Sequence, residues 1–124
     1  MQSSERVARP KVALVSRDLM VRGRVEIALG TGVHQLEVAA DGELPAGLDL
    51  LLLDLNRDAQ VRLAWLEHIG RTLPAAEVIC FGPHTEMADL NPRARAAGAD
   101  RCVANSHLAE TLQRWLRSRH RATS

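Results

Sequence analysis

The sequence predicts one α/β domain in which a parallel sheet is covered by helices on both faces. Short apolar runs that suit strands alternate with longer stretches whose apolar residues recur at helical spacing. That alternation is typical of βαβ units, whose crossovers are right-handed. Residues 50–53 are four leucines in a row, and such a run, too short to cross a membrane, suits a strand buried on both faces. The length of 124 residues favours a single domain that buries enough surface to fold alone.

Composition excludes several classes of protein. The chain is 46% apolar and 25% charged, which is typical of a globular domain. Its net charge of +1 is too small to attract the whole protein to nucleic acid or membranes. The N-terminus lacks the apolar core of a signal peptide, and no run approaches the ~18 apolar residues of a membrane span. We therefore expect a cytoplasmic protein whose two cysteines, Cys80 and Cys102, are reduced core thiols.

The first part of the chain predicts two strands around a helix. Residues 12–16 are an apolar run and residues 33–39 alternate, so both suit strands. Between them, Asp18 is expected to cap a helix that ends at Gly30. The apolar stripe of that helix consists of Val21, Val25, Ala28 and Leu29.

Residues 41–48 stand where the alternation calls for a second helix. They contain two glycines and a proline, so at most one helical turn is expected and an extended strap is feasible. A strap covers less of the sheet than a helix, so part of the face over the first three strands is expected to stay exposed and apolar. A partner or a second copy of the chain would dock there, or on the irregular segment around Pro92 with the fifth strand and the last helix. The alternative is that Leu44 and Leu48 fold down and close the gap.

The middle of the chain predicts two more strands around a helix. Residues 50–55 form the third strand, and residues 77–81 form the fourth, which a turn at 82–84 follows. Asp58 is expected to cap the intervening helix, which Pro74 stops. The apolar positions of this helix are Val61, Trp65, Leu66, Ile69 and Leu73.

The last part of the chain predicts an interrupted helix, a strand and a final helix. Pro92 suits a helix interior poorly, so either a short turn precedes it or Asn91 caps a second piece that starts at Pro92. Residues 101–104 form the fifth strand, and Asn105 or Ser106 caps the helix that follows. The inward positions of that helix are Leu108, Leu112, Trp115 and Leu116.

The two ends are expected to lie outside the domain. Residues 1–10 are polar and end in a proline, which predicts a flexible N-terminal arm. The domain itself is expected to span residues 11–119, and residues 120–124 to form a C-terminal tail.

Asp54 is the most informative polar residue, because it stands where the third strand would end. Ligands of open α/β sheets bind at the carboxyl ends of strands, so a carboxylate there is a candidate reactive group. Burying that carboxylate without a partner would be costly.

Three segments of the chain resemble the receiver domain of bacterial two-component response regulators. They are residues 11–18 at the first strand, residues 51–56 at the third, and residues 96–106 leading through the fifth. The resemblance implies a flavodoxin-like, receiver-like three-layer sandwich with a five-stranded parallel sheet in the order 2-1-3-4-5. In this chain the second helix would be shortened or absent.

The resemblance implies that Asp54 stands at the phosphoacceptor position. Family members also hold magnesium with two acidic residues after the first strand, and those positions are Ser16 and Arg17 here, with Asp18 one residue late. Magnesium prefers hard oxygen ligands, and an arginine opposes a divalent cation. The acidic pocket is therefore degenerate.

Further family positions differ as well. The hydroxyl residue of the fourth strand corresponds to Gly82, the lysine of the fifth to Asn105, and the aromatic switch residue to Cys102. Phosphoryl transfer depends on charge neutralisation by metal and cations. The resemblance thus implies a pseudo-receiver that needs no cofactor.

Arg17 and Asp54 are expected to lie at the carboxyl ends of neighbouring strands. The preferred interpretation is an ion pair that replaces the metal site and fixes Asp54 as an acceptor. The alternatives are that Arg17 points to solvent while Asp54 bonds backbone amides, or that Arg17 and the first helix bind an anion. His84, on a loop at the same edge, is a candidate proton-transfer group or pH-sensitive neighbour of Asp54, or is simply exposed.

Motifs for other chemistries do not occur in the sequence. It has no Gly-x-Ser-x-Gly elbow, no Gly-rich phosphate loop and no metal-ligand spacing of its histidines. We expect that the protein is not an enzyme but a stand-alone interaction module in bacterial signalling or regulation. It would bind a protein partner or a second copy of the chain and would act without phosphorylation. We expect it to bind neither membranes nor nucleic acid. The alternatives are a receiver that still takes a phosphoryl group at Asp54 with Mg²⁺, and an anion or small-molecule binding domain that uses the cleft around Arg17 and Asp54.

Overall fold

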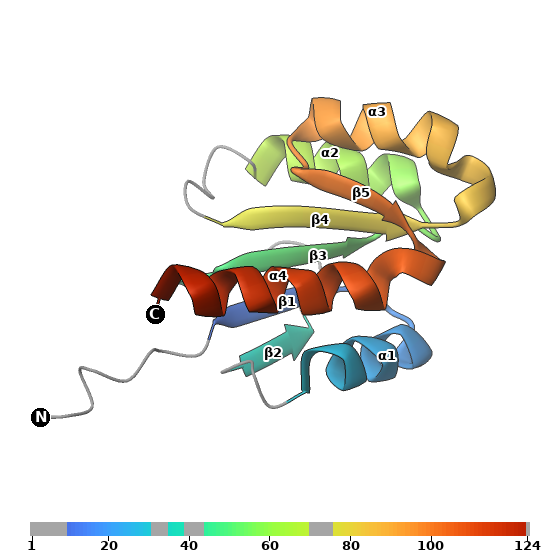
Figure 1. The fold of residues 1–124 in the computed structure, drawn as a ribbon. Coiled ribbons are helices and arrows are strands. Elements are labelled where there is room, and N and C mark those ends of the chain that lie inside the picture. Colours follow the sequence, from blue (N-terminus) through green and yellow to red (C-terminus); the bar gives the residue numbers. More distant parts are fainter. Residues whose placement is uncertain (1–9, 31–34, 39–43, 70–75, 124) are drawn as a thin grey trace, which may run out of the picture.

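Parallel strands form one sheet that helices cover on both faces (Figure 1). The structure is a computed structural model. It describes residues 10–30, 35–38, 44–69 and 76–123, with the backbone alone for 35–38 and 120–123. Within these residues the sheet has the order β2-β1-β3-β4-β5, which is the order that the resemblance implied. The strands are β1 (Lys11–Val15), β2 (Gln35–Val38), β3 (Leu50–Asp54), β4 (Glu77–Gly82) and β5 (Arg101–Ala104).

Two pairs of helices make the outer layers. Helices α1 (Leu19–Leu29) and α4 (Leu108–Thr123) cover one face of the sheet, and α2 (Ala59–Ile69) and α3 (Met87–Ala97) cover the other. Each pair encloses its own apolar core against the sheet. The predicted flavodoxin-like α/β fold is therefore confirmed.

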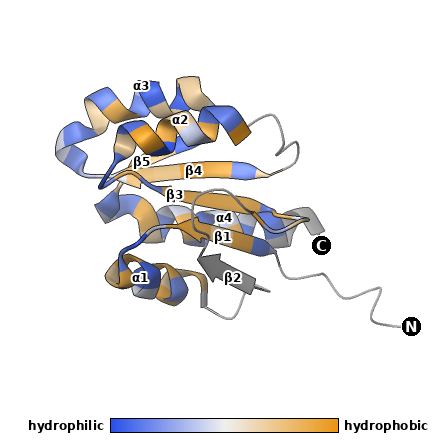
Figure 2. Cartoon of the chain, turned by 180° about the vertical axis from the view of Figure 1, so that it is seen from behind, coloured by the Kyte–Doolittle hydropathy of each residue, from blue (hydrophilic) through white to orange (hydrophobic). Residues whose placement is uncertain are grey.

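Strand β3 lies at the centre of the sheet and is buried on both faces, as its four leucines predict. Leu51 and Leu53 belong to the core under α2 and α3, whereas Leu50 and Leu52 belong to the core under α1 and α4. The hydropathy of the chain shows the same arrangement, because the three central strands are almost wholly hydrophobic (Figure 2). The strand ends at Asp54, one residue earlier than predicted.

The two cysteines are free core thiols, as predicted. Cys80 and Cys102 are register partners on β4 and β5 and belong to the core under α2 and α3. Burial, with a smaller contribution from Cys102, raises the pKa of the Cys80 thiol to about 12. Burial also raises the pKa of Cys102. Both thiols therefore stay protonated and unreactive near neutral pH.

Helix α1 begins and ends at the residues that the sequence predicts. The Asp18 carboxylate accepts from the backbone N–H groups of Met20 at 2.8 Å and of Val21 at 3.4 Å, which satisfies donors at the helix start. Gly30 ends the helix with a positive φ of 59°, a backbone conformation that glycine adopts without strain.

Helix α2 begins after Asp58 as predicted, but its inward face is turned by one residue. The predicted core residue Val61 is 64% exposed, and Arg62 and Leu63 are buried. Leu66 is fully buried, in agreement with the prediction. The apolar pattern of the sequence is compatible with a helix that turns either Val61 or Arg62 inward. Packing against β3 selects the orientation that buries the arginine.

The prediction that Pro92 interrupts a helix is wrong. Helix α3 runs unbroken through Pro92, and a short 3₁₀ turn, His84–Glu86 (η4), precedes it. Proline removes one backbone donor and costs helix stability. Burial of Leu90 and Ala94 against the sheet compensates for that loss. The Asn91 side chain also anchors the helix, because its Nδ2 donates to the Cys102 carbonyl at 3.0 Å.

The start of α4 also differs from the prediction. A second 3₁₀ turn, Asn105–His107 (η5), comes before the helix, and no side chain caps that turn. Asn105 bonds to Asn56 of another loop instead. The backbone of α4 continues to Thr123, so part of the predicted C-terminal tail is helical.

The strap after β2 is described from Leu44 onward, and residues 44–49 form a turn rather than a helix. Leu48 is buried, and Leu44 is half-buried against the same core under α2 and α3. The Lys11 ammonium donates to the Ala46 carbonyl at 3.1 Å, and the Lys11 amide donates to the Asp49 carboxylate at 2.8 Å. Leu44 and Leu48 thus fold down onto the core, as the alternative interpretation expected.

Some predictions fall outside the described residues. These are the arm before Pro10, the ends of the second predicted strand, the first residues of the strap, and Leu73 with Pro74. Over the part of the chain that is described, no helix is both long and apolar enough to span a bilayer.

Candidate functional site

Asp54 lies at the carboxyl end of the central strand, among polar residues from three strand ends. Ser16 directly follows β1, Asn56 follows β3, and Asn105 follows β5. Parallel strands end at one edge of a sheet, so residues distant in sequence meet there. Asp54 is only 5% exposed, and its carboxylate therefore depends on protein partners.

Both carboxylate oxygens of Asp54 are held by hydrogen bonds. The Ser16 hydroxyl donates to Oδ2 at 2.7 Å. The backbone N–H and the side-chain Nδ2 of Asn56 donate to Oδ1 at 2.8 and 2.7 Å. Ser16 is itself fixed, because its Oγ accepts the Asp18 amide at 3.1 Å. Three donors thus hold one buried negative charge.

A pair of amide side chains joins the ends of β3 and β5 across β4. Asn56 Nδ2 donates to Asn105 Oδ1 at 3.1 Å, and Asn105 Nδ2 donates to Asn56 Oδ1 at 2.7 Å. We call this reciprocal pair the amide clamp. Through Asn56 the clamp is continuous with the Asp54 carboxylate and with Ser16. The position that the resemblance assigns to a lysine therefore carries a neutral group that is already engaged.

Arg62 is a buried cation that the sequence analysis missed. It comes from α2, is 6% exposed, and donates from one nitrogen, Nη1, to two backbone carbonyls. These are the Val15 carbonyl at 2.9 Å and the Asp54 carbonyl at 3.0 Å. The guanidinium thus joins the ends of β1 and β3 directly beneath the site. One signal in the sequence pointed to this position. Arg62 comes four residues before Leu66 and seven before Ile69, spacings that place it on the same face of the helix as those apolar residues.

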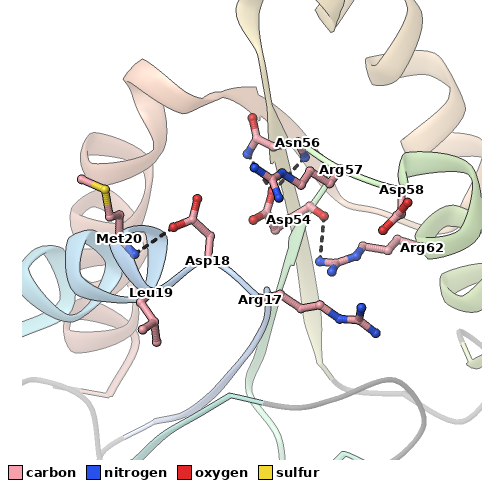
Figure 3. Close-up of a pocket in the computed structure, with 9 residues that line it drawn as sticks. All are labelled: Arg17, Asp18, Leu19, Met20, Asp54, Asn56, Arg57, Asp58 and Arg62. Atoms are coloured by element: carbon pink, nitrogen blue, oxygen red, sulfur yellow. Dashed lines mark hydrogen bonds between the residues drawn. The ribbon is translucent and has the colours of Figure 1, made fainter.

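The preferred interpretation of Arg17 was wrong. The Asp54 carboxylate has its hydrogen bonds from Ser16 and Asn56, and the exposed Arg17 side chain extends away from it (Figure 3). The closest alternative was that Asp54 bonds a backbone amide while Arg17 points outward. That alternative holds in part, because the amide of Asn56 is one of the three donors.

A pocket of about 480 Å³ opens beside these residues (Figure 3). We call it the Asp54 pocket. Its charged lining consists of three arginines and three aspartates: Arg17, Arg57, Arg62, Asp18, Asp54 and Asp58. Leu19 and Met20 form an apolar wall, and both are largely exposed.

The donor set fits a magnesium ion poorly. Magnesium requires several oxygen ligands at octahedral geometry. Asp54 is the buried carboxylate of the pocket, and its two oxygens already accept three hydrogen bonds. Asp18 uses Oδ1 to cap α1. Among the described residues, no group of three or more histidine, cysteine or acidic side chains is arranged to hold a metal ion.

The remaining predicted site residues do not join this network. Gly82 is buried at the end of β4, where an added Cβ would lie 3.0 Å from Leu90 Cδ1. Cys102 lies in the core with its Sγ 4.0 Å from Met87 Sδ. His84 is exposed in η4 and is not among the residues that line the Asp54 pocket.

Neither a family model nor a curated protein matches the sequence. Solved structures do match the fold. The N-terminal signal receiver domain of a two-component response regulator from Bacteroides fragilis superimposes with a TM-score of 0.72 at 18% identity, over 94% of this chain and 98% of that one. A response regulator from Thermotoga maritima gives 0.66 at 15% identity, over 91% and 98% of the two chains. An orphan response regulator of H. pylori gives 0.61 at 18% identity, over 92% and 98%. Identities this low show a shared fold alone, and the protein therefore has the fold of response-regulator receiver domains.

Proposed function

We propose that this domain is a pseudo-receiver, a binding module in signalling or regulation that acts without phosphorylation and without catalysis. The observation that carries the proposal is the state of Asp54. Its carboxylate is 5% exposed and accepts three hydrogen bonds from Ser16 and Asn56. A nucleophile must offer a lone pair to the incoming phosphorus, and three of the roughly four acceptor sites of this carboxylate are already engaged.

The charges around Asp54 support the same proposal. Phosphoryl transfer proceeds through positioning and charge neutralisation by metal and cations. The neighbours that would supply these are a serine at position 16 and an asparagine at position 105, both neutral, and the nearest buried cation, Arg62, is bound to backbone carbonyls. Accepting a phosphoryl group would disturb the hydrogen bond from Ser16 if it attached at Oδ2, and those from Asn56 if it attached at Oδ1.

The exposed apolar residues of α1 supply a surface for a protein partner. Leu19, Met20 and Ile27 are 79%, 70% and 83% exposed. Leu19 and Met20 line the Asp54 pocket, and Ile27 lines a neighbouring groove between α1 and α4. Large exposed apolar side chains that gather on one helix are typical of interaction sites.

A backbone amide NMR titration with Mg²⁺ and beryllofluoride, an acyl-phosphate mimic, tests the proposal. We expect no saturable shift at the amides of residues 54–56 or 105 at millimolar concentrations. Asp54→Asn is the matched control, because it retains the side-chain shape but replaces one carboxylate oxygen by an NH₂ group and removes the charge. Saturable shifts in the native protein that the control lacks would establish a live phosphoacceptor and overturn the proposal.

The oligomeric state distinguishes the two kinds of partner. Sedimentation at rising protein concentration, compared between the native chain and an Ile27→Asp variant, reports whether a second copy docks on α1. Self-association that the variant loses identifies a homodimer. A monomer at all concentrations directs the search to a different protein.

A further inference from the structure

Arg62 has more hydrogen-bond donors than the protein uses. A guanidinium carries five N–H groups. The two on Nη1 donate to the carbonyls of Val15 and Asp54. Within the described residues, Nε and Nη2 have no protein acceptor, which leaves three N–H groups on a side chain that is 6% exposed.

Unpaired donors on a buried charge are costly. An unsatisfied buried donor loses the hydration that it would have in water, and the loss is larger for a charged group. Most buried polar groups in proteins therefore have a partner, from protein or from ordered water, whose place a ligand can take. The arginine is also held in place, because its two carbonyl bonds fix the guanidinium plane.

Arg62 is also one of the residues that line the Asp54 pocket. Arg62 lines this pocket together with the exposed Arg17 and Arg57 (Figure 3). The volume of about 480 Å³ lies within the range of small-molecule sites. A ligand entering from solvent would meet the two exposed arginines first and the buried Arg62 after them.

The three aspartates of the pocket offset this positive charge only in part. Asp54 Oδ1 and Oδ2 accept hydrogen bonds from Asn56 and Ser16. Asp18 Oδ1 accepts amides at the start of α1. Asp58 is exposed to solvent, so its charge is screened. Among the described residues, the buried donors of this pocket that lack an acceptor are therefore those of Arg62.

We infer that the Asp54 pocket binds a small oxyanion, a carboxylate or a phosphate, through Nε and Nη2 of Arg62 and without a metal ion. Two adjacent N–H groups of a guanidinium match two oxygens of a carboxylate or phosphate. Leu19 and Met20 beside the arginines provide contact for an apolar portion of the ligand. This site is separate from phosphoryl uptake, since it uses donors of α2 and leaves the Asp54 carboxylate in its own hydrogen bonds.

The test is a ¹⁵N NMR titration of the full chain with inorganic phosphate and, separately, with acetate, in the presence of EDTA. The Nε–Hε signal of Arg62 reports the site directly, because burial slows its exchange with water. We expect a saturable shift of that signal with at least one probe. The two probes distinguish the sources of the oxyanion: a response to phosphate points to phosphate esters, and a response to acetate points to organic acids.

Variants assign the binding to the arginine. Arg62→Lys retains the charge but loses the planar pair of donors, so we expect affinity to fall at least about tenfold. Arg57→Gln removes an exposed cation of the pocket and should weaken binding a few-fold without touching the fold. Arg93→Gln on α3, outside the pocket, is the matched control and should bind as the native protein does.

Three results would each overturn the inference. The first is an Arg62 Nε–Hε signal that stays unshifted by both probes up to about 50 mM, a range weaker than ordinary specific binding. The second is unchanged affinity in both Arg62→Lys and Arg57→Gln. The third is binding that appears only when Mg²⁺ replaces EDTA, which would instead indicate receiver chemistry at Asp54.

Discussion

Replacing Arg62 by methionine should destabilise the domain by about 2–4 kcal/mol. The substitution retains most of the side-chain volume but removes the donor to the carbonyls of Val15 and Asp54, which are 2.9 and 3.0 Å from Nη1. Each buried acceptor left unsatisfied costs about 1–3 kcal/mol, or about 2–6 kcal/mol for two. Removing a buried guanidinium recovers part of this, because its own desolvation penalty disappears.

Urea unfolding followed by the fluorescence of Trp65 and Trp115 measures this change. The control is Arg93→Met, whose exposed ion pair with Asp89 should contribute less than about 0.5 kcal/mol. By thermal melting, Arg62→Met should lower Tm by about 10 °C or more. A loss below about 0.5 kcal/mol would mean that the two carbonyls find other partners. The view of Arg62 as the link between β1 and β3 would then be refuted.

Three further predictions concern a buried hydrogen bond, two glycines and a buried thiol. Ser16→Ala removes the donor to Asp54 Oδ2 at 2.7 Å and should cost about 1–2 kcal/mol in urea unfolding; an effect no larger than that of exposed Ser106→Ala would contradict the assignment. Gly98→Ala should lower the stability measured in a thermal melt by about 1 kcal/mol, because a φ of 118° is strained for a residue with a Cβ. No atom lies within 4 Å of the added Cβ, so the cost would come from the backbone alone. Gly23→Ala, inside α1, also has open space and should instead stabilise by about 0.5–1 kcal/mol, so changes of the same sign would argue against backbone strain at Gly98. Burial raises the pKa of the Cys80 thiol from 9.0 to about 12, so the unfolded chain loses this proton first and stability should fall as pH rises above about 9. Cys80→Ala should flatten that alkaline decline in urea unfolding, and identical pH profiles would rule out the thiol as its source.

Much of the fold was predictable because its signals are local. The four leucines of β3 predict a strand buried on both faces, and the Asp18 carboxylate caps α1 as its position indicated. The alternation of strands and helices along the chain predicts a parallel sheet without any knowledge of long-range contacts. Pro92 shows where a local rule fails, since packing of Leu90 and Ala94 against the sheet outweighs the lost backbone bond.

The site was predictable in place but not in detail. The end of β3 identified Asp54, yet its partners depend on geometry that the sequence does not encode locally. Asn56 and Asn105 are 49 residues apart, and their pairing follows from the sheet order. Arg62 was missed because an apolar pattern leaves the rotation of a helix uncertain by one residue. Arg17 was given a role from its charge and its place at the carboxyl end of a neighbouring strand, but neither of these fixes the direction of an exposed side chain.

Gly82 bears on whether this site could be changed by single mutations. A side chain at position 82 would bring its Cβ to 3.0 Å from Leu90 Cδ1 and 3.6 Å from Leu55 Cβ. A serine or threonine there, which the resemblance associates with phosphoryl uptake, would need Leu90 to move or to become smaller as well. The effect of such a change on stability therefore depends on whether the Leu90 side chain can shift by a few tenths of an ångström. In evolutionary terms, the packing of α3 against the end of β4 favours retention of Gly82 over its replacement by a larger residue.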